Sequence, residues 1–218
     1  RSYMLKVYNY IASGVALTGF VAAYLANQIM QNPELAQTIY GGGMGWVIML
    51  SPLAMILVIN FGVNKLSAFA LQAAFWGFAG LMGLSLASIF LVYTGESIAR
   101  VFFITAASFG ALSLWGYTTK KDLTGWGSFL IMGLFGIIIA SIVNIFMASS
   151  AMHFAISVIG VLIFAGLTAY DTQKIKEMYW EADGHELTSK KAVMGALRLY
   201  LDFINLFLML LRLLGNRD

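Results

Sequence analysis

The sequence predicts an all-α membrane protein, a bundle of seven transmembrane helices, from three observations. Of its 218 residues, 60% are hydrophobic and only 11% are charged, whereas a soluble domain carries roughly 25% charged residues. The mean hydropathy is +0.82. The apolar residues also fall in runs long enough to cross about 30 Å of hydrocarbon. Because these runs take up nearly the whole chain, we expect a single transmembrane domain over 1–218, surrounded by the lipid bilayer.

A window of about 20 residues places seven spans along the chain. The connections are short, except for the charged segment KIKEMYWEADGHELTSKK, which we expect to form a loop over 174–191. The first span is too long for a cleavable signal peptide and lacks a small-residue cleavage site. The predicted spans are about 4–30, 43–64, 67–93, 97–119, 125–147, 151–173 and 192–214.

The basic residues are distributed unevenly between the two sides of this bundle. Seven spans put the termini on opposite sides, and most lysines and arginines fall on the N-terminal side. The positive-inside rule therefore places the N-terminus in the cytoplasm and the C-terminus outside. The basic residues on the N-terminal side are Arg1, Lys6, Lys65, Lys120, Lys121, Lys174, Lys176, Lys190 and Lys191, against Arg100, Arg212 and Arg217 on the other side.

Some residues inside the spans predict helix packing rather than function. Pro52 lies in the second span, where it removes a helical hydrogen bond, and we expect a neighbouring helix to satisfy the freed carbonyl. Small residues at helix-packing spacing let two backbones approach closely. These are Gly77, Gly80 and Gly83, then Ala106, Gly110 and Ala111, then Gly133 and Gly136.

The composition and motifs argue against an enzyme. The chain has no cysteine and two histidines, too few for a histidine-based zinc site. Tyr170–Asp171 resembles the first motif of intramembrane aspartyl proteases. Their second motif is Gly-x-Gly-Asp, where this chain has LYLD, and no Pro-Ala-Leu follows. The chain also lacks a serine nucleophile motif with a partnered histidine. We expect no enzymatic activity, no cofactor and, at a net charge of +3, no nucleic-acid partner.

Two aspartates lie where a charge is costly. Asp202 falls inside the apolar run LRLYLDFINLFLMLLRLLG, and an aspartate at a helix centre in the bilayer costs about 2.5–3.5 kcal/mol. Asp171 lies near the end of the sixth span. If that helix continues to about Trp180 and the last begins near Lys190, the rise per residue puts the aspartates about 13 and 18 Å from the cytoplasmic ends. Antiparallel neighbours would then bring both carboxylates to a similar depth.

Two carboxylates that meet in a low dielectric cannot both ionise cheaply, so the pair shares a proton. Such a pair is a pH-sensitive switch, and when deprotonated it attracts a hard cation such as Ca²⁺ as a transient ligand. The alternative is that Arg198 and Asp202, spaced i and i+4, form an ion pair on one helix that serves only structure. That alternative does not account for Asp171.

Two further charges lie near the ends of spans. Lys65, at the inner end of the second span, either latches the aspartates or is an ordinary interfacial residue whose ammonium snorkels to water. Glu96, at the outer end of the third span, either gathers cations at the outer mouth or is likewise interfacial. The predicted helices carry few acidic residues and no ring of them, so any ion flux should be slow.

Four stretches carry a resemblance to a known family: ALRLYLDFINLFLMLLRLLG, GLTAYDTQKI, YTGESI and KKDLTGWGSFL. They are similar to the Bax-inhibitor family, the transmembrane Bax-inhibitor-motif proteins. The resemblance covers nearly the whole chain, and LYLDFINLF is its most specific part. The short form resembles bacterial members, which implies an inner-membrane location.

This resemblance implies a seven-helix fold with the last helix central, and a pH-sensitive calcium leak channel switched by an aspartate pair. That pair corresponds to Asp171 and Asp202. A latch arginine of a bacterial member would fall near Lys65, and a lysine there lacks the bidentate fork of a guanidinium. Arg198 is a second candidate counter-ion.

Two functions follow from the sequence. The first is a passive Ca²⁺ leak gated by the aspartate pair, with Ca²⁺ as the permeant ion. The alternative is an interaction protein that modulates a membrane-anchored quality-control protease, with the charged 174–191 segment as the candidate surface. The sequence leaves the opening pH undetermined, because deprotonation adds repulsion within the pair but also strengthens a lysine latch.

Overall fold

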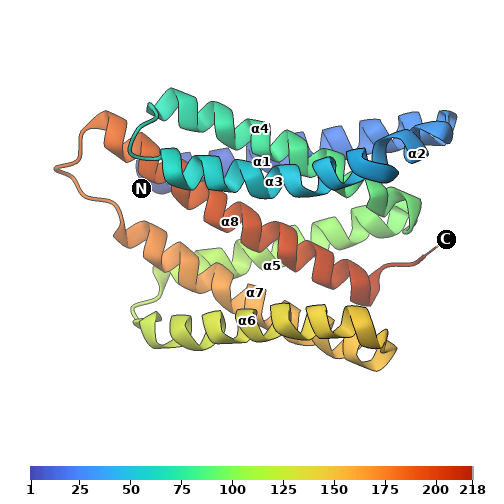
Figure 1. Cartoon of the computed structure of the whole chain (residues 1–218). Coiled ribbons are helices and arrows are strands. Elements are labelled where there is room, and N and C mark those ends of the chain that lie inside the picture. Colours follow the sequence, from blue (N-terminus) through green and yellow to red (C-terminus); the bar gives the residue numbers. More distant parts are fainter. Residues whose placement is uncertain (218) are drawn as a thin grey trace. The chain divides into compact units, whose positions relative to one another are not determined.

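The computed structural model describes residues 1–217, which form eight α-helices and one short 3₁₀ helix without a strand (Figure 1). Seven helices are long and apolar enough to cross a membrane, counting α4 together with η1. This confirms the predicted all-α architecture with seven spans. The elements are α1 Ser2–Gln31, α2 Glu34–Tyr40, α3 Gly42–Gly62, α4 Ala68–Leu86, η1 Ala87–Leu91, α5 Gly95–Thr118, α6 Thr124–Met147, α7 Ser150–Glu177 and α8 His185–Leu214.

The predicted loop over 174–191 is wrong at both ends, because α7 continues to Glu177 and α8 already begins at His185. The apolar pattern stops where charges begin, but helical hydrogen bonding continues into the interfacial region. The cations of the last turn of α7, Lys174 and Lys176, interact favourably with the helix C-terminus. The connection before the second span likewise contains a short helix, α2, which starts after Pro33, a residue well suited to a helix start.

The chain divides into two compact units. The first unit comprises 1–93 and 179–197, and the second comprises 94–178 and 198–217. The helix α8 therefore contributes its N-terminal part to the first unit and its C-terminal part to the second.

In the first unit, α4 packs against both α1 and α3, and α2 packs on α3 (Figure 1). Pro52 inside α3 leaves the carbonyl of Ile48 without its helical donor. The hydroxyls of Ser51 and of Ser85, which lies on α4, donate to that carbonyl at 2.9 and 3.0 Å. The expectation that a neighbouring helix satisfies the freed group is therefore confirmed.

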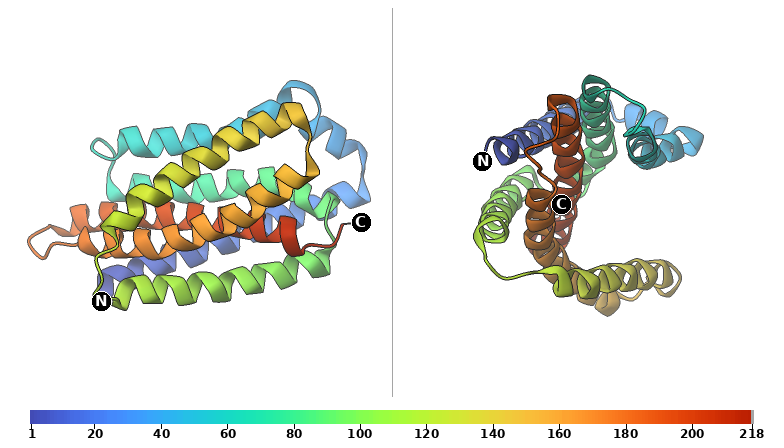
Figure 2. Two further views of the ribbon diagram at one scale, coloured as in Figure 1. Left: turned by 90° about the horizontal axis from the view of Figure 1, so that it is seen from below. Right: turned by 90° about the vertical axis from the view of Figure 1, so that its left-hand side faces the viewer.

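In the second unit, α7 is the shared neighbour of α5 and α6, which lie on different sides of it in the end-on view of Figure 2. The backbones of α5 and α7 approach closely at Gly116, where an added Cβ would lie 2.3 Å from the carbonyl oxygen of Ala169. Of the glycines that the sequence marks for packing, Gly80, Gly110 and Gly136 face open space. Spacing alone therefore identified the packing glycines only in part.

Polar side chains of α7 fix the end of α5 and the α5–α6 loop. The hydroxyls of Ser113 and Thr172 lie 2.8 Å apart between α5 and α7. The Gln173 amide accepts from the backbone N–H of Leu123 at 2.9 Å and donates to the carbonyl of Lys121 at 2.7 Å. Since both bonds reach one loop, Gln173 holds residues 121–123 against α7.

Candidate functional site

The first element of the candidate site is an ion pair between α7 and α8. The guanidinium Nη2 of Arg198 donates to Oδ1 of Asp171 at 3.0 Å. The side chain of Arg198 is 47% exposed and that of Asp171 is 9% exposed. The predicted alternative of an ion pair between Arg198 and Asp202 on one helix is therefore wrong. An arginine placed before an acid at this spacing pairs weakly along its own helix, and here the neighbouring helix supplies the partner.

The second element is the buried carboxyl group of Asp202. Its oxygen Oδ2 is fully buried and has no hydrogen-bond partner among the described residues. The carboxyl of Asp171, on the neighbouring helix α7, lines the same cavity. A buried carboxylate oxygen without a partner is costly, and a proton shared with the adjacent carboxyl would remove that cost.

Both aspartates line one cavity of about 650 Å³ between α6, α7 and the C-terminal part of α8. The wall from α6 is almost entirely apolar, with Ile131 and Ile138 among its exposed side chains. Apart from Ser141 of α6, the polar groups come from the other two helices, and Arg198 and Asn205 are among them. The cavity is thus an apolar-walled space with its charges on one side.

The depths of the two aspartates differ from those that the sequence predicts, because both helix ends lie elsewhere. With α7 ending at Glu177 and α8 starting at His185, Asp171 lies about 9 Å and Asp202 about 26 Å from those ends. The helix ends are therefore poor markers of depth, and it is a side-chain contact that relates the two helices: Arg198 of α8 reaches Asp171 of α7. Asp202 follows one turn later, about 6 Å further along α8.

Neither Lys65, which belongs to the first unit, nor Glu96 is among the residues that line this cavity. Lys65 is exposed in the turn between α3 and α4, and its ammonium pairs with no carboxylate of its own unit among the described residues. Glu96 is exposed in the first turn of α5, where an acid stabilises the helix N-terminus. The structure therefore brings together Asp171, Arg198 and Asp202, whereas Lys65 and Glu96 do not line the cavity that these three share.

The number of carboxylates near one another limits which metal ions the site could hold. Within residues 1–217 no group of three or more His, Cys, Asp or Glu side chains lies close enough to bind a metal ion. Ca²⁺ takes six to eight oxygen ligands at a resident site. Two carboxylates, one of them paired with Arg198, suit at most the brief attraction of a hydrated cation.

Sequence reasoning missed two polar residues of this region. Gln173, two residues after Asp171, carries no signal in the sequence, because a polar side chain near the end of a span needs no special role. Asn205 follows Asp202 by about one turn of α8, and its amide donates to the Leu201 carbonyl at 2.8 Å. Its place within an apolar run was a usable signal, since polar residues inside spans usually face the bundle interior.

Comparisons with known proteins agree with the architecture. The family model described as "Inhibitor of apoptosis-promoting Bax1" (Bax1-I) matches residues 1–218. The chain is 50% identical over 217 residues to the uncharacterised protein RP147 of Rickettsia prowazekii, covering 100% of this chain and 90% of the relative.

Two further relatives are similarly close. The inner membrane protein YbhL of Escherichia coli K12 is 46% identical over 220 residues, covering 100% of this chain and 92% of the relative. An uncharacterised protein of Caulobacter vibrioides is 46% identical over 226 residues, with 100% and 90% coverage. The chain is an integral membrane protein with seven helices that are long and apolar enough to span a membrane. On the family match and these relatives, it belongs to the Bax1-I family of Bax-inhibitor-like proteins.

Proposed function

We propose that this protein is a passive calcium leak of the bacterial inner membrane, without enzymatic activity, and that Asp171 and Asp202 gate it. The inner-membrane location rests on the likeness to YbhL. The observation that carries the gate is the cavity that both aspartates line, in which one oxygen of Asp202 is buried without a partner among the described residues. Ca²⁺ is the permeant ion and no cofactor takes part.

With this arrangement of charges, the site is closed. Arg198 neutralises Asp171, and Asp202 is neutral while it holds the shared proton. The cavity then offers a cation no net negative charge near the pair. An apolar α6 wall without compensating charge makes entry of a divalent ion costly.

Loss of the shared proton opens the site to cations. It leaves one uncompensated negative charge beside the Arg198–Asp171 pair, and this charge attracts Ca²⁺ into the cavity. Arg212 also lines the cavity, but it lies ten residues after Asp202, about 15 Å further along α8, and its exposed side chain turns to the Met209 sulfur at 3.9 Å. The leak should therefore increase as the pH rises through the titration of the pair.

The test is Ca²⁺ influx into dye-loaded proteoliposomes between pH 5 and 8. We expect a pH-dependent leak in the wild type and a leak with a flat pH profile in Asp171→Asn and Asp202→Asn, since neither variant can share a proton between carboxyls. Glu181→Gln, which neutralises an exposed carboxylate between α7 and α8, is the matched control and should keep the wild-type profile. A wild-type protein without flux above empty liposomes at any pH would remove the channel proposal.

The alternative proposal is modulation of a membrane-anchored quality-control protease. One observation favours a partner surface: Trp180, in the connection between α7 and α8, is 68% exposed. Co-purification with such a protease that survives Asp171→Asn and Asp202→Asn, but not Trp180→Ala, would favour this function over the leak.

A further inference from the structure

A second cavity in the second unit faces away from the aspartate pair. It measures about 960 Å³ and is lined by α5, α6, α7 and the α5–α6 loop. It exists because α5 and α6 both pack on α7 but not extensively on each other. The result is a groove with α7 as its floor.

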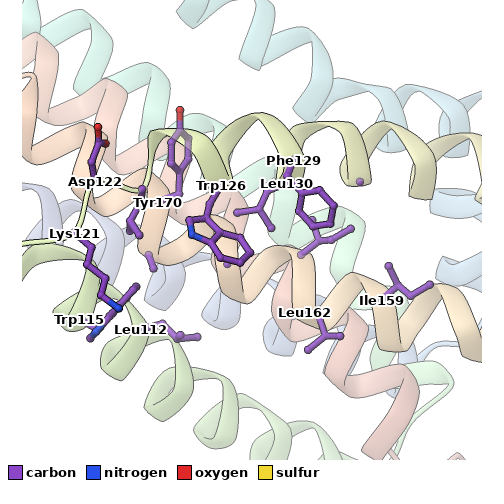
Figure 3. Close-up of a pocket in the computed structure, with 15 residues that line it drawn as sticks. Leu112, Trp115, Lys121, Asp122, Trp126, Phe129, Leu130, Ile159, Leu162 and Tyr170 are labelled. Carbon is purple, nitrogen blue, oxygen red and sulfur yellow. The ribbon is translucent and has the colours of Figure 1, made fainter. Parts of the chain in front are cut away.

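The lining of this groove changes along its length, from charged and aromatic side chains at the loop end to apolar side chains at the other end (Figure 3). At the loop end lie Lys121 and two tryptophans, Trp115 and Trp126, which are 47% and 63% exposed. In Figure 3 the Lys121 side chain extends toward Trp115, and the Trp126 ring projects from α6 into the space. Toward the other end the lining is apolar, with Phe129 on α6 and then Leu162 and Ile159 on α7.

The length of the groove matches one leaflet of a bilayer. Along α7 it runs from Tyr170 to Ile159, which is about 17 Å at the helical rise per residue. The hydrocarbon core is about 30 Å thick. A groove of about half that length, with its polar end at the α5–α6 loop, suits an acyl chain from one leaflet better than a partner helix, which would need the full thickness.

The charges at the loop end select the headgroup. Lys174 donates to the Thr124 hydroxyl at 2.5 Å and pairs with Glu177 at 3.2 Å, and Lys176 donates to the Tyr117 carbonyl at 2.8 Å. The ammonium of Lys121 has no partner among residues 1–217. It is thus the lysine of the groove that is free to meet a phosphate.

Gln173 and Asp122 also affect the arrangement of side chains at the loop end of the groove. Gln173 bonds the backbone on both sides of residue 122 and so fixes where Lys121 starts. The Asp122 carboxylate turns to the Thr124 backbone and hydroxyl at 3.0 and 2.6 Å, and these hydrogen bonds lower the pKa of Asp122. Asp122, which also lines the groove, is thus held by Thr124 at the start of α6.

We propose that this groove binds one anionic phospholipid of the leaflet on the side of the α5–α6 loop. One acyl chain lies between α5 and α6, the two tryptophans sit at the level of the ester groups, and the phosphate meets Lys121. Tryptophan and lysine at the headgroup level are the usual anchors of membrane proteins, and a lysine near an anionic surface increases affinity.

The test is native mass spectrometry of the purified full chain with phosphatidylglycerol and phosphatidylcholine added in equal amounts. We expect one phosphatidylglycerol to be retained in preference to phosphatidylcholine. Lys121→Gln should weaken that first binding about fivefold, the effect of one lysine near an anionic surface, and Lys121→Arg should preserve it. Lys190→Gln, a lysine of α8 that does not line the groove, is the matched control.

A second measurement locates the chain in the groove. Phosphatidylglycerol brominated on its acyl chains should quench tryptophan emission in the wild type, and Trp126→Phe should remove part of that quenching. Equal retention of both lipids, or wild-type binding by Lys121→Gln, would overturn the proposal. So would a stable dimer that forms through this groove and excludes lipid, because the occupant would then be a second copy of the chain.

Discussion

Arg198 determines the charge of the aspartate cavity in this arrangement. It is the only cation that contacts Asp171 among the described residues of the second unit, and it reaches the carboxylate from the exposed side. The sequence identified Asp171 and Asp202 because aspartates in apolar spans are energetically costly. It did not identify the partner of Arg198, because the choice between Asp171 and Asp202 depends on the stagger of two helices.

Substitution of Arg198 tests its role as a latch. Arg198→Gln removes the positive charge, so Asp171 stays uncompensated and the cavity is negative even when the pair holds its proton. We expect a severalfold higher Ca²⁺ leak at low pH, where the wild type is closed, measured with the same dye-loaded proteoliposomes. Arg198→Lys keeps the charge and should stay closed. An unchanged leak in Arg198→Gln would show that the ion pair does not hold the gate.

At the scale of elements, the existence and order of the seven spans were predictable, because apolar runs of this length have few other uses. The ends of α7 and α8 were not, because hydropathy marks the edge of the hydrocarbon and not the end of helical hydrogen bonding. The contact between α5 and α7 could also not be predicted from the sequence. Gly116 makes that contact, whereas Gly110, which has packing-like spacing, faces open space.

A pair of substitutions on α5 tests this packing. Gly116→Ala places a methyl group against the backbone of Ala169, which cannot move aside as a flexible side chain would. We expect a loss of about 1–3 kcal/mol in the free energy of unfolding, seen as a lower melting temperature in detergent. Gly110→Ala on the same helix adds a methyl group in open space and should leave the melting temperature unchanged or slightly higher. Equal melting temperatures for the two variants would contradict the close approach.

At the scale of the whole molecule, the family and the seven-span architecture fit the sequence prediction. The orientation and the central position of the last helix remain predictions. The orientation rests on the distribution of lysine and arginine, which reflects insertion and leaves no trace in the packing of helices.

The absence of cysteine from the sequence makes the orientation simple to measure. Single cysteines at Lys120, in the α5–α6 loop, and at Gly95, at the start of α5, lie at opposite ends of one span. In intact cells with a permeable outer membrane, a membrane-impermeant thiol reagent should label Gly95→Cys and leave Lys120→Cys unlabelled until the inner membrane is opened. The reverse pattern would place the N-terminus outside and move the aspartate pair to the outer half of the membrane.

The most direct measurement of the shared proton is an infrared pH titration of the protein in lipid, which follows the carbonyl band of a protonated carboxylic acid. We expect a band in the wild type that is lost in Asp202→Asn and disappears with rising pH at the midpoint where the Ca²⁺ leak increases. A wild-type protein whose buried carboxyls show no such band at any pH between 5 and 8, while the leak still varies with pH, would contradict the shared proton as the gate.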